Sequence, residues 1–398
     1  MRARVAVAAL LVALISPAAA AASLRSALAG ALRVPHVSLA ATGAVVLDLE
    51  TGATIYSRNA GLSLLPASNE KLAVTYAALT ALGPAFTIET DVLGDGQQVG
   101  TTWQGDLVLK GYGDPTLSDA DLTALARQVR ASGITRVTGS VLGDESWFDA
   151  RRTALGWKAA FYITESPPLS ALVVDRGLVG RYTSPDPALA AAQLFRSALA
   201  RAGVHVGGSA AHGTADGAAV PIAAVDSPPL SAIVQWMDRV SDNFTAEMLV
   251  KELGAVQSDR GTTAAGVGFI TGLLAQAGVP LGGVRLVDGS GLSLLDRLTP
   301  EALASLLTTM WNDVEVRLDL LSSLPVAGRT GTLHDRMRGG AATGVVRAKT
   351  GTTSNASALS GFAGDRYVFS ILQNGWPISW SWARVAQDRF ATVLAAAQ

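Results

Sequence analysis

The pattern of apolar residues changes twice along the chain, and this constrains the fold more than any other feature. Long stretches with helical periodicity occur before about residue 90 and again after residue 225. Between them lie short strand patterns, glycine-rich turns and two helical patterns. We therefore predict an inserted α+β domain at residues 91–224, with residues 23–90 and 225–398 together forming the domain that it interrupts.

The outer segments predict helices and an antiparallel pairing of strands. The expected strands are 42–49, 53–56, 345–349, 358–362 and 367–373. The expected helices are 66–82, 233–253, 263–277, 300–311 and 382–396. Inside the insertion we expect strands at 106–110, 137–142 and 172–174 and helices at 120–132 and 187–202. The chain as a whole is α/β (α+β) in class.

The first 22 residues have the composition of a secretory signal peptide. Arg2 and Arg4 precede an apolar run, and small residues at 18–22 allow cleavage after Ala20 or after Ala22. The run is too short to span a bilayer, so we expect no membrane anchor after cleavage. We expect secretion across the cytoplasmic membrane into the periplasmic or extracellular cell-wall space. The chain has no cysteine, so no disulfide supports the exported fold.

Charge and histidine content exclude several classes of function. The formal net charge is −1, which leaves no basic excess for nucleic acid. The four histidines are scattered along the chain without ligand spacing: His36, His205, His212 and His334. We therefore predict no metal and no other cofactor. The G-x-S-x-G motif of α/β-hydrolases is also absent from the sequence.

Three short motifs along the chain carry the residue types that nucleophilic serine chemistry uses. They are Ser68-Asn69-Glu70-Lys71, Ser241-Asp242-Asn243 and Lys349-Thr350-Gly351-Thr352. Each motif alone is weak evidence, because a helix lysine, a capping serine or a strand glycine is common. Together they match the S-x-x-K, S-D-N and K-T-G set of penicillin-binding proteins and serine β-lactamases.

The spacing of the first motif suits acyl transfer. A serine hydroxyl needs a nearby base to attack a carbonyl, and residues three apart on a helix, such as Ser68 and Lys71, share one face. Burial and a second cation such as Lys349 would both favour the neutral, basic form of Lys71. The unpaired N–H groups at the helix start, including that of Ser68, can bind the oxyanion. Lys349 and Thr350 offer donors to a terminal carboxylate, and Gly351 allows close approach of a substrate backbone.

The sequence resembles the class C low-molecular-mass penicillin-binding proteins, the D-alanyl-D-alanine carboxypeptidase/endopeptidase family. The resemblance extends beyond the motifs and covers most of the chain after the signal peptide. It rests on segments 65–72, 111–117, 241–249, 288–293 and 324–333. Two departures are Tyr112, where the family usually has glycine, and an insertion shorter than in the larger members, which leaves a third, nested domain in doubt.

This resemblance implies a serine β-lactamase/transpeptidase-like domain, in which helices flank an antiparallel sheet and an all-helical part adjoins it, interrupted by the insertion. It implies a serine D,D-peptidase that acts on peptidoglycan stem peptides and is covalently inhibited by β-lactam antibiotics. The implied roles are nucleophile for Ser68, general base for Lys71, proton relay and substrate amide contact for Ser241 and Asn243, carboxylate binding for Lys349 and Thr350, and oxyanion binding by the N–H groups of Ser68 and Thr352.

Other functions remain open at this point. A serine β-lactamase or esterase of the same superfamily is the enzymatic alternative, although the long interval from Ser68 to Ser241 counts against a class A β-lactamase. A non-catalytic scaffold that binds the cell wall is the alternative from another class, and the intact motifs argue against it. The sequence does not distinguish carboxypeptidase from endopeptidase preference, and it does not predict the role of the insertion or the oligomeric state.

Overall fold

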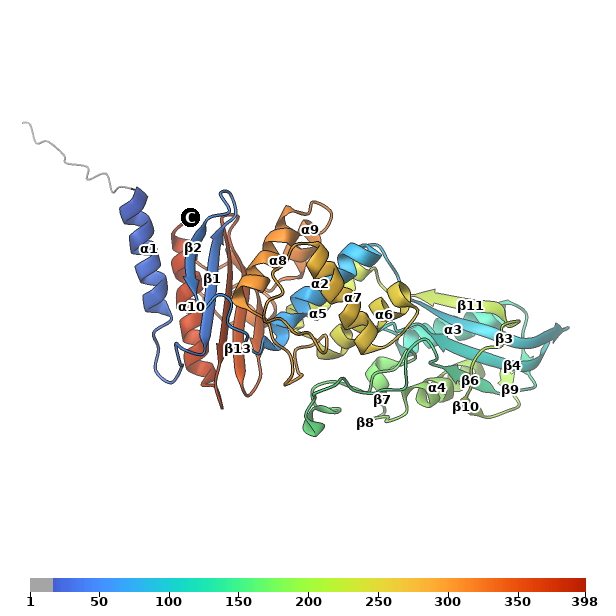
Figure 1. Cartoon of the computed structure of the whole chain (residues 1–398). Coiled ribbons are helices and arrows are strands. Elements are labelled where there is room, and N and C mark those ends of the chain that lie inside the picture. Colours follow the sequence, from blue (N-terminus) through green and yellow to red (C-terminus); the bar gives the residue numbers. More distant parts are fainter. Residues whose placement is uncertain (1–16) are drawn as a thin grey trace, which may run out of the picture.

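The computed structural model describes residues 17–398, and the first 16 residues of the predicted signal peptide lie outside this part. The molecule is elongated (Figure 1). One sheet with its covering helices lies at one end, a group of helices lies in the middle, and a second sheet lies at the other end. Within the described residues, none of the helices combines the length and the apolar character needed to cross a membrane.

The first sheet joins the two ends of the chain. Its strand order is β12-β13-β14-β1-β2, and every neighbouring pair is antiparallel. The strands are β1 (Thr42–Asp48), β2 (Thr54–Arg58), β12 (Val346–Thr352), β13 (Ala356–Ala363) and β14 (Tyr367–Asn374). Helices α1 (Pro17–Ala31) and α10 (Trp380–Ala396) cover one face, where Leu28, Phe369 and Phe390 form part of an apolar core. The strands and the last helix expected here are therefore present.

The middle of the molecule is a group of helices that packs on the opposite face of this sheet. These helices are α2 (Lys71–Leu82), α5 (Leu230–Val240), α6 (Asn243–Ser258), α7 (Thr263–Gln276), α8 (Pro300–Asn312) and α9 (Arg317–Ser323). Helix α2 is buried from Lys71 through Leu79. A helix that is apolar on all sides belongs in the centre of a core, and α2 contacts α5, α6, α7 and α8.

The predicted helix over 233–253 is wrong as a single element, because α5 and α6 are separate helices. Ser241 takes left-handed dihedral angles (φ 61°) after the last residue of α5. The Asp242 side chain then accepts a hydrogen bond from the N–H of Thr245 at 2.7 Å and caps α6. An aspartate that caps a new helix start outweighs the apolar periodicity that continues on both sides. The break leaves Ser241, Asp242 and Asn243 at a junction of two helices.

The segment between α2 and α5, which we call the insertion, contains the second sheet. Its main path runs β10-β6-β4-β3-β11, and α3 (Asp119–Ala131) and α4 (Pro187–Arg201) supply apolar side chains to its core. The strands are β3 (Glu89–Val99), β4 (Thr102–Gly111), β5 (Arg136–Val137), β6 (Val141–Asp144), β9 (His205–Val206), β10 (Ala210–His212) and β11 (Val220–Asp226). Because β3 pairs with β11 from Glu89↔Asp226 onward, limits drawn at 91 and 224 would cut both strands.

Two predicted strands of the insertion are wrong. Residues 138–140 interrupt the predicted strand 137–142, which is divided between β5 and β6. Residues 172–174 are buried but form no ladder, and the carbonyl of Ala171 only accepts one hydrogen bond from the N–H of Gly113 at 2.8 Å. The strand pattern there reflects burial, because Leu172 and Val174 contribute to the core of the second sheet and Val173 faces the opposite way. Continuous burial in a short apolar run does not by itself distinguish a strand from an extended loop.

A separate apolar cluster joins the insertion to α6. From the insertion it contains Phe148, Leu169 and Val173, and from α6 it contains Phe244 and Met248, all of them buried. Phe244 follows Asn243 directly. The insertion therefore packs against the helix that begins at the second sequence motif.

Candidate active site

Ser68 lies in a short 3-10 turn, Ala67–Glu70, that leads into α2. The expected position at the start of a helix is confirmed, with the difference that the first turn is tighter than an α-helix. The tighter turn and the following α-helical residue bring the two side chains together, and Lys71 Nζ donates a hydrogen bond to Ser68 Oγ at 3.0 Å. The first motif therefore supplies a hydroxyl and an amine in direct contact.

Lys71 is fully buried and has two further partners. Its Nζ donates to Asn243 Oδ1 and to the carbonyl oxygen of Ser290, each at 2.8 Å. Burial lowers the pKa of Lys71 to about 8, against the opposing effect of buried carboxylates around it. The neutral amine can keep two of its partners as acceptors and turn its lone pair toward Ser68, as a general base requires.

Lys349 of β12 is the second buried lysine of the site. Its Nζ donates to Ser241 Oγ at 2.7 Å and to the carbonyl oxygen of Thr350 at 3.1 Å. Burial, together with repulsion from Lys71, lowers the pKa of Lys349 to about 7. The expected pair of destabilised cations is present. Burial is the main cause for both lysines, and their mutual repulsion adds to it at Lys349.

The end of β12 lies against the turn that carries Ser68. A Cβ placed on Gly351 would lie 2.9 Å from the carbonyl oxygen of Pro66 and 3.1 Å from the backbone nitrogen of Ser68. Only glycine permits this approach without displacement of backbone. Thr350 Oγ1 donates to Thr332 Oγ1 at 2.7 Å, so Thr332 joins the set of hydroxyl groups. Thr352 follows Gly351 and is exposed at the edge.

A loop at residues 288–293 completes the environment of Lys71. The Asp288 carboxylate accepts hydrogen bonds from the N–H groups of Gly291 (2.7 Å) and Ser293 (2.8 Å) and thereby shapes the loop. In this loop conformation the carbonyl group of Ser290 points at Lys71 Nζ. Sequence reasoning noted this segment only as part of the family resemblance, because a backbone carbonyl carries no signature of its own in a sequence.

The insertion also reaches the site, which sequence reasoning missed. Asn243 Nδ2 donates to the carbonyl oxygen of Glu165 at 3.0 Å, and Trp157 Nε1 donates to Asp288 Oδ2 at 2.7 Å. Both residues lie in irregular loops of the insertion. Contacts of this kind depend on how loops fold over a distant helix, so local periodicity gives no signal for them.

Three buried acids next to Lys71 form the one group within residues 17–398 whose ligand atoms are close enough together to hold a metal ion. Carboxylate oxygens of Glu70, Asp288 and Asp296 lie within 4.8 Å of one another. Asp288 already accepts several hydrogen bonds, whereas neither oxygen of Glu70 has a partner in the described part of the chain. A proton shared between the carboxyl groups of Glu70 and Asp296 satisfies such oxygens without a metal ion. Mg²⁺ and Ca²⁺ need about six oxygen ligands, whereas each of the three acids brings one oxygen to this cluster. The expectation that the protein uses no metal stays a prediction.

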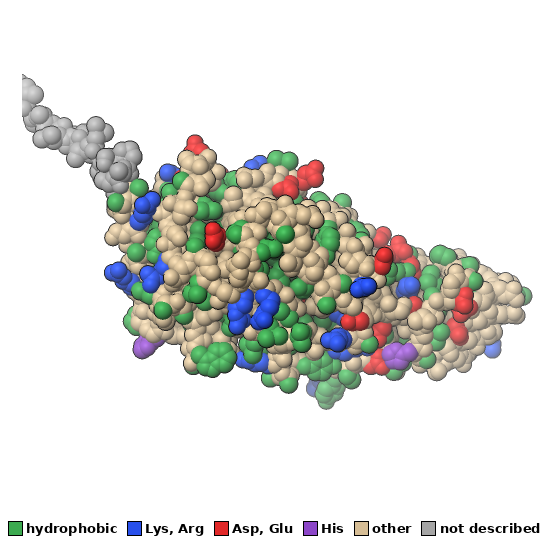
Figure 2. Space-filling view, viewed as in Figure 1, with side chains coloured by type: hydrophobic (Ala, Val, Ile, Leu, Met, Phe, Trp, Pro, Cys, Tyr) green, Lys and Arg blue, Asp and Glu red, His purple; other side chains and the backbone are tan. Residues whose placement is uncertain are grey.

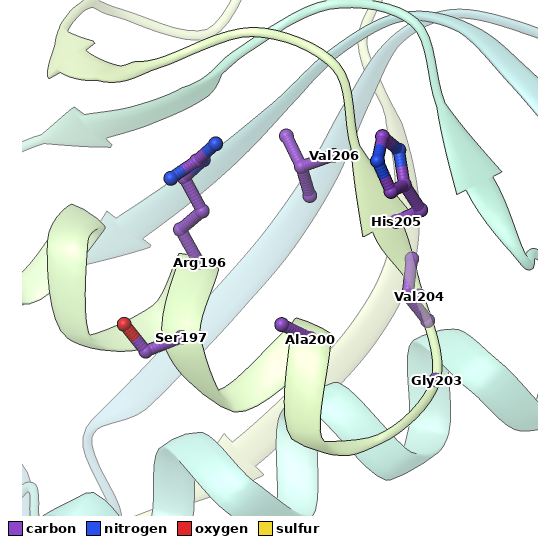
Figure 3. Close-up of a pocket in the computed structure, with 7 residues that line it drawn as sticks. All are labelled: Arg196, Ser197, Ala200, Gly203, Val204, His205 and Val206. Carbon is purple, nitrogen blue, oxygen red and sulfur yellow. The ribbon is translucent and has the colours of Figure 1, made fainter.

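The close-up in Figure 3 shows a pocket in the insertion that is unrelated to the motifs. Its volume is about 440 Å³, and its lining includes Arg196, Ser197 and His205 but none of the motif residues. On the face shown in Figure 2, acidic and basic side chains are interspersed, without a large patch of one sign. Neither feature competes with the Ser68 site as a place for covalent chemistry.

Comparison with known proteins gives matches over most of the chain. The family model of D-Ala-D-Ala carboxypeptidase 3 (S13) matches residues 24–185 and 180–397. A D-alanyl-D-alanine carboxypeptidase from Actinomadura sp. (strain R39) is 33% identical over 432 residues, which cover 86% of this chain and 79% of that protein. Carboxypeptidase DacB from Mycolicibacterium smegmatis is also 33% identical, over 93% of this chain and 83% of that protein.

Among solved structures, penicillin-binding protein 4 (dacB) from Haemophilus influenzae superposes with a TM-score of 0.80. The two chains are 22% identical over 92% of this chain and 97% of the other. A second structure of the same protein is a complex with a β-lactam. At this identity the likeness shows the fold, and it confirms the predicted β-lactamase/transpeptidase-like α/β fold with an inserted domain.

Proposed function

The chain belongs to the D-Ala-D-Ala carboxypeptidase 3 (S13) family of serine-type carboxypeptidases, and from this premise we propose that it cuts D-alanyl-D-alanine bonds of peptidoglycan stem peptides through an acyl-enzyme on Ser68. One observation carries the assignment of the nucleophile. Ser68 Oγ lies 3.0 Å from the Nζ of Lys71, a buried lysine whose pKa burial lowers to about 8. A hydroxyl next to a lysine that loses its proton this readily is an activated nucleophile.

In the proposed acylation, neutral Lys71 takes the proton of Ser68 as Oγ attacks the carbonyl carbon of the penultimate D-alanine. The N–H groups of Ser68 and Thr352 bind the resulting oxyanion, which the close contact of Gly351 with the Ser68 turn supports. The proton then passes from Lys71 to the departing amine with the help of Ser241. Water hydrolyses the ester, with Lys71 again as the base, and free Ser68 is restored.

The terminal carboxylate of the substrate would bind beside Lys349, Thr350 and Thr332. Lys349 and Thr350 of β12 supply an ammonium group and a hydroxyl group, and Thr332, from the 3-10 turn Gly331–Leu333, supplies a second hydroxyl group hydrogen-bonded to the first. A carboxylate at this position stabilises the ammonium form of Lys349. With Lys349 held charged, its repulsion favours the neutral form of Lys71, so substrate binding itself promotes the basic state. Asn243, which already contacts Lys71, would bind the substrate amide.

We propose that β-lactam antibiotics acylate the same serine, because their ring amide and carboxylate present the groups that the substrate presents. The β-lactam complex of the Haemophilus influenzae protein, which shares the fold, supports this proposal. Activity as a β-lactamase or esterase remains the alternative. We also propose that the protein is exported and works in the periplasmic or extracellular cell-wall space, on the basis of the composition of residues 1–22.

Release of D-alanine from a pentapeptide mimic tests the proposed function directly. The protein should release D-alanine in the presence of a metal chelator. Ser68→Ala should abolish release without a change in thermal unfolding, since the partly buried Ser68 hydroxyl contributes little to packing. Loss of activity on chelation, restored by zinc, would contradict the metal-independent mechanism. Defined cross-linked muropeptides, with products identified by mass spectrometry, would separate carboxypeptidase from endopeptidase preference.

A further inference from the structure

Asp242 lies between two residues of the proposed site but faces the other way. Its neighbours Ser241 and Asn243 contact Lys349 and Lys71, respectively. The Asp242 carboxylate instead caps α6 and meets a side chain of the insertion. The contacts that fix the Asp242 side chain therefore also fix the directions in which Ser241 and Asn243 point.

The partner of Asp242 is Arg176, which comes from a short turn, Asp175–Gly177, in the insertion. Arg176 Nη1 donates to Asp242 Oδ1 at 3.1 Å and Nη2 donates to Oδ2 at 2.8 Å, so the contact is bidentate. The guanidinium also lies 4.9 Å from the ring centroid of Phe244. Arginine alone offers a planar fork for a carboxylate and a flat face for an aromatic ring.

Electrostatics agree with this pairing. Burial alone would raise the pKa of Asp242, but the Arg176 guanidinium and the hydrogen bonds at the start of α6 hold it below its usual value. The carboxylate is thus charged, and its side chain is 14% exposed, against 39% for Arg176. A mostly buried carboxylate without this cation would be left with only its contacts to Thr245 in the first turn of α6.

Arg176 lies in a strained stretch of backbone. Asp175 (φ 47°) and Arg176 (φ 58°) are consecutive non-glycine residues in the left-handed region, although Gly177 stands next to them. Such conformations persist where the surrounding structure demands them, and they concentrate at functional sites. Here the strained turn carries the Arg176 side chain that contacts Asp242 at the junction of α5 and α6.

We infer that Arg176 is a positioning residue for acyl transfer. It holds Asp242, and through it the residues 241–243, in the arrangement that brings Ser241 to Lys349 and Asn243 to Lys71. The inference rests on the proposed function, since it assigns Arg176 to the acylation step at Ser68. It gives the insertion a role in catalysis in addition to any contact with the cell wall, because the fold of the interrupted domain does not by itself supply this cation.

The test compares acylation by a fluorescent penicillin in four full-length proteins: wild type, Arg176→Gly, Arg176→Met and Arg181→Met. Glycine suits the left-handed backbone, and methionine keeps an apolar stem for Phe244. Arg181 is exposed in the same part of the insertion and serves as the matched control. We expect the acylation rate constant to fall about tenfold for both Arg176 variants, with initial penicillin affinity little changed, and to stay at the wild-type value for Arg181→Met.

Chemical rescue separates positioning from a purely structural role. Because the Arg176 side chain is partly exposed, ethylguanidinium at concentrations that do not denature the protein should restore much of the rate of Arg176→Gly and leave wild type unchanged. Wild-type rates in both variants would overturn the inference. So would a slow rate that follows a lowered thermal midpoint and does not respond to ethylguanidinium. If wild type itself is not acylated, the proposed function fails instead, so the two failures can be told apart.

Discussion

At the scale of single residues, catalysis depends on when Lys71 loses its proton. Burial lowers the pKa of Lys71 to about 8, and the neutral amine is the form that accepts a proton from Ser68. The acylation rate should therefore rise as the pH increases through about 8, and fall about tenfold for each pH unit below that range. Stopped-flow acylation across the pH range measures this directly. A rate that stays level from about pH 6 to about pH 10 would show that Lys71 is not the base.

Glu70, the neighbour of Lys71 in the first motif, should behave as a neutral acid. Burial, with the nearby Asp296 and Asp288 carboxylates, raises the pKa of Glu70 well above its usual value, and burial raises that of Asp296 to about 10. An uncharged Glu70 does not stabilise the ammonium form of Lys71. Glutamine copies the shape of a protonated glutamic acid, so Glu70→Gln should acylate within about threefold of wild type.

Thermal unfolding adds a second measurement for Glu70. A carboxyl group whose pKa is raised in the folded state makes the protein less stable as the pH rises. The loss begins near the pKa of the group in the unfolded chain and continues up to its pKa in the folded protein. The unfolding midpoint of Glu70→Gln should match that of wild type at low pH and exceed it increasingly at neutral and alkaline pH. A variant that is slower by tenfold or more, and less stable at every pH, would indicate that Glu70 is ionised or holds a cation.

The sequence predicted which side chains form the site, but it did not predict all the groups that contact them. Ser68, Lys71, Asn243 and Lys349 lie together as the motifs indicated. The carbonyl of Ser290 could not be predicted, because every residue has a carbonyl and only the closure of the loop by Asp288 selects this one. Sequence motifs identify side chains, whereas several contacts in this site are made by backbone groups.

At the scale of elements, the close approach of β12 to the Ser68 turn should depend on the absence of a side chain at Gly351. Gly351→Ala would place a Cβ against backbone atoms of Pro66 and Ser68, which must then move apart. We expect acylation at least about tenfold slower, because the oxyanion donors separate. Gly268→Ala is the control, since its Cβ would meet open space in the middle of α7 and alanine favours a helix by about 1 kcal/mol.

Equal acylation by Gly351→Ala and Gly268→Ala would show that the contact between β12 and the Ser68 turn does not matter.

The prediction of elements succeeded for the hairpin of β1 and β2, where β1 is buried along almost its whole length and Gly52 lies in the turn. It failed between α5 and α6, where apolar periodicity continues through a functional break. Side chains that must point into a site override local preference at such places.

At the scale of the whole molecule, the insertion and α6 should unfold together. Phe148 of the insertion packs in one cluster with Phe244 and Met248 of α6. Phe148→Ala should therefore destabilise the protein by about 3 kcal/mol and lower the midpoint of a single calorimetric transition. Leu178→Ala, at a half-exposed position of the insertion, should leave that midpoint almost unchanged. Two transitions, of which only one responds to Phe148→Ala, would show that the parts are independent.

The sequence indicated an insertion from a change in pattern, but it could not show how the insertion attaches. The predicted limits 91 and 224 rest on the change in the pattern of apolar residues. The pairing of β3 with β11, however, already begins at Glu89 and Asp226. Contacts such as Trp157 with Asp288 join residues that are far apart in the chain. Such contacts depend on how two distant segments fit together in three dimensions, so no local pattern encodes them.

The most direct test of covalent catalysis at Ser68 is the intact mass of the protein during exposure to benzylpenicillin. The account predicts one penicillin per chain on Ser68, no adduct on Ser68→Ala and parallel loss of D-alanine release. It also predicts an adduct that persists for minutes or longer, because Lys71 serves both acylation and hydrolysis, whereas a class A β-lactamase has a separate glutamate that activates water. A protein that turns over many equivalents of penicillin per second while ignoring D-alanyl-D-alanine peptides, or that labels equally without Ser68, would contradict it.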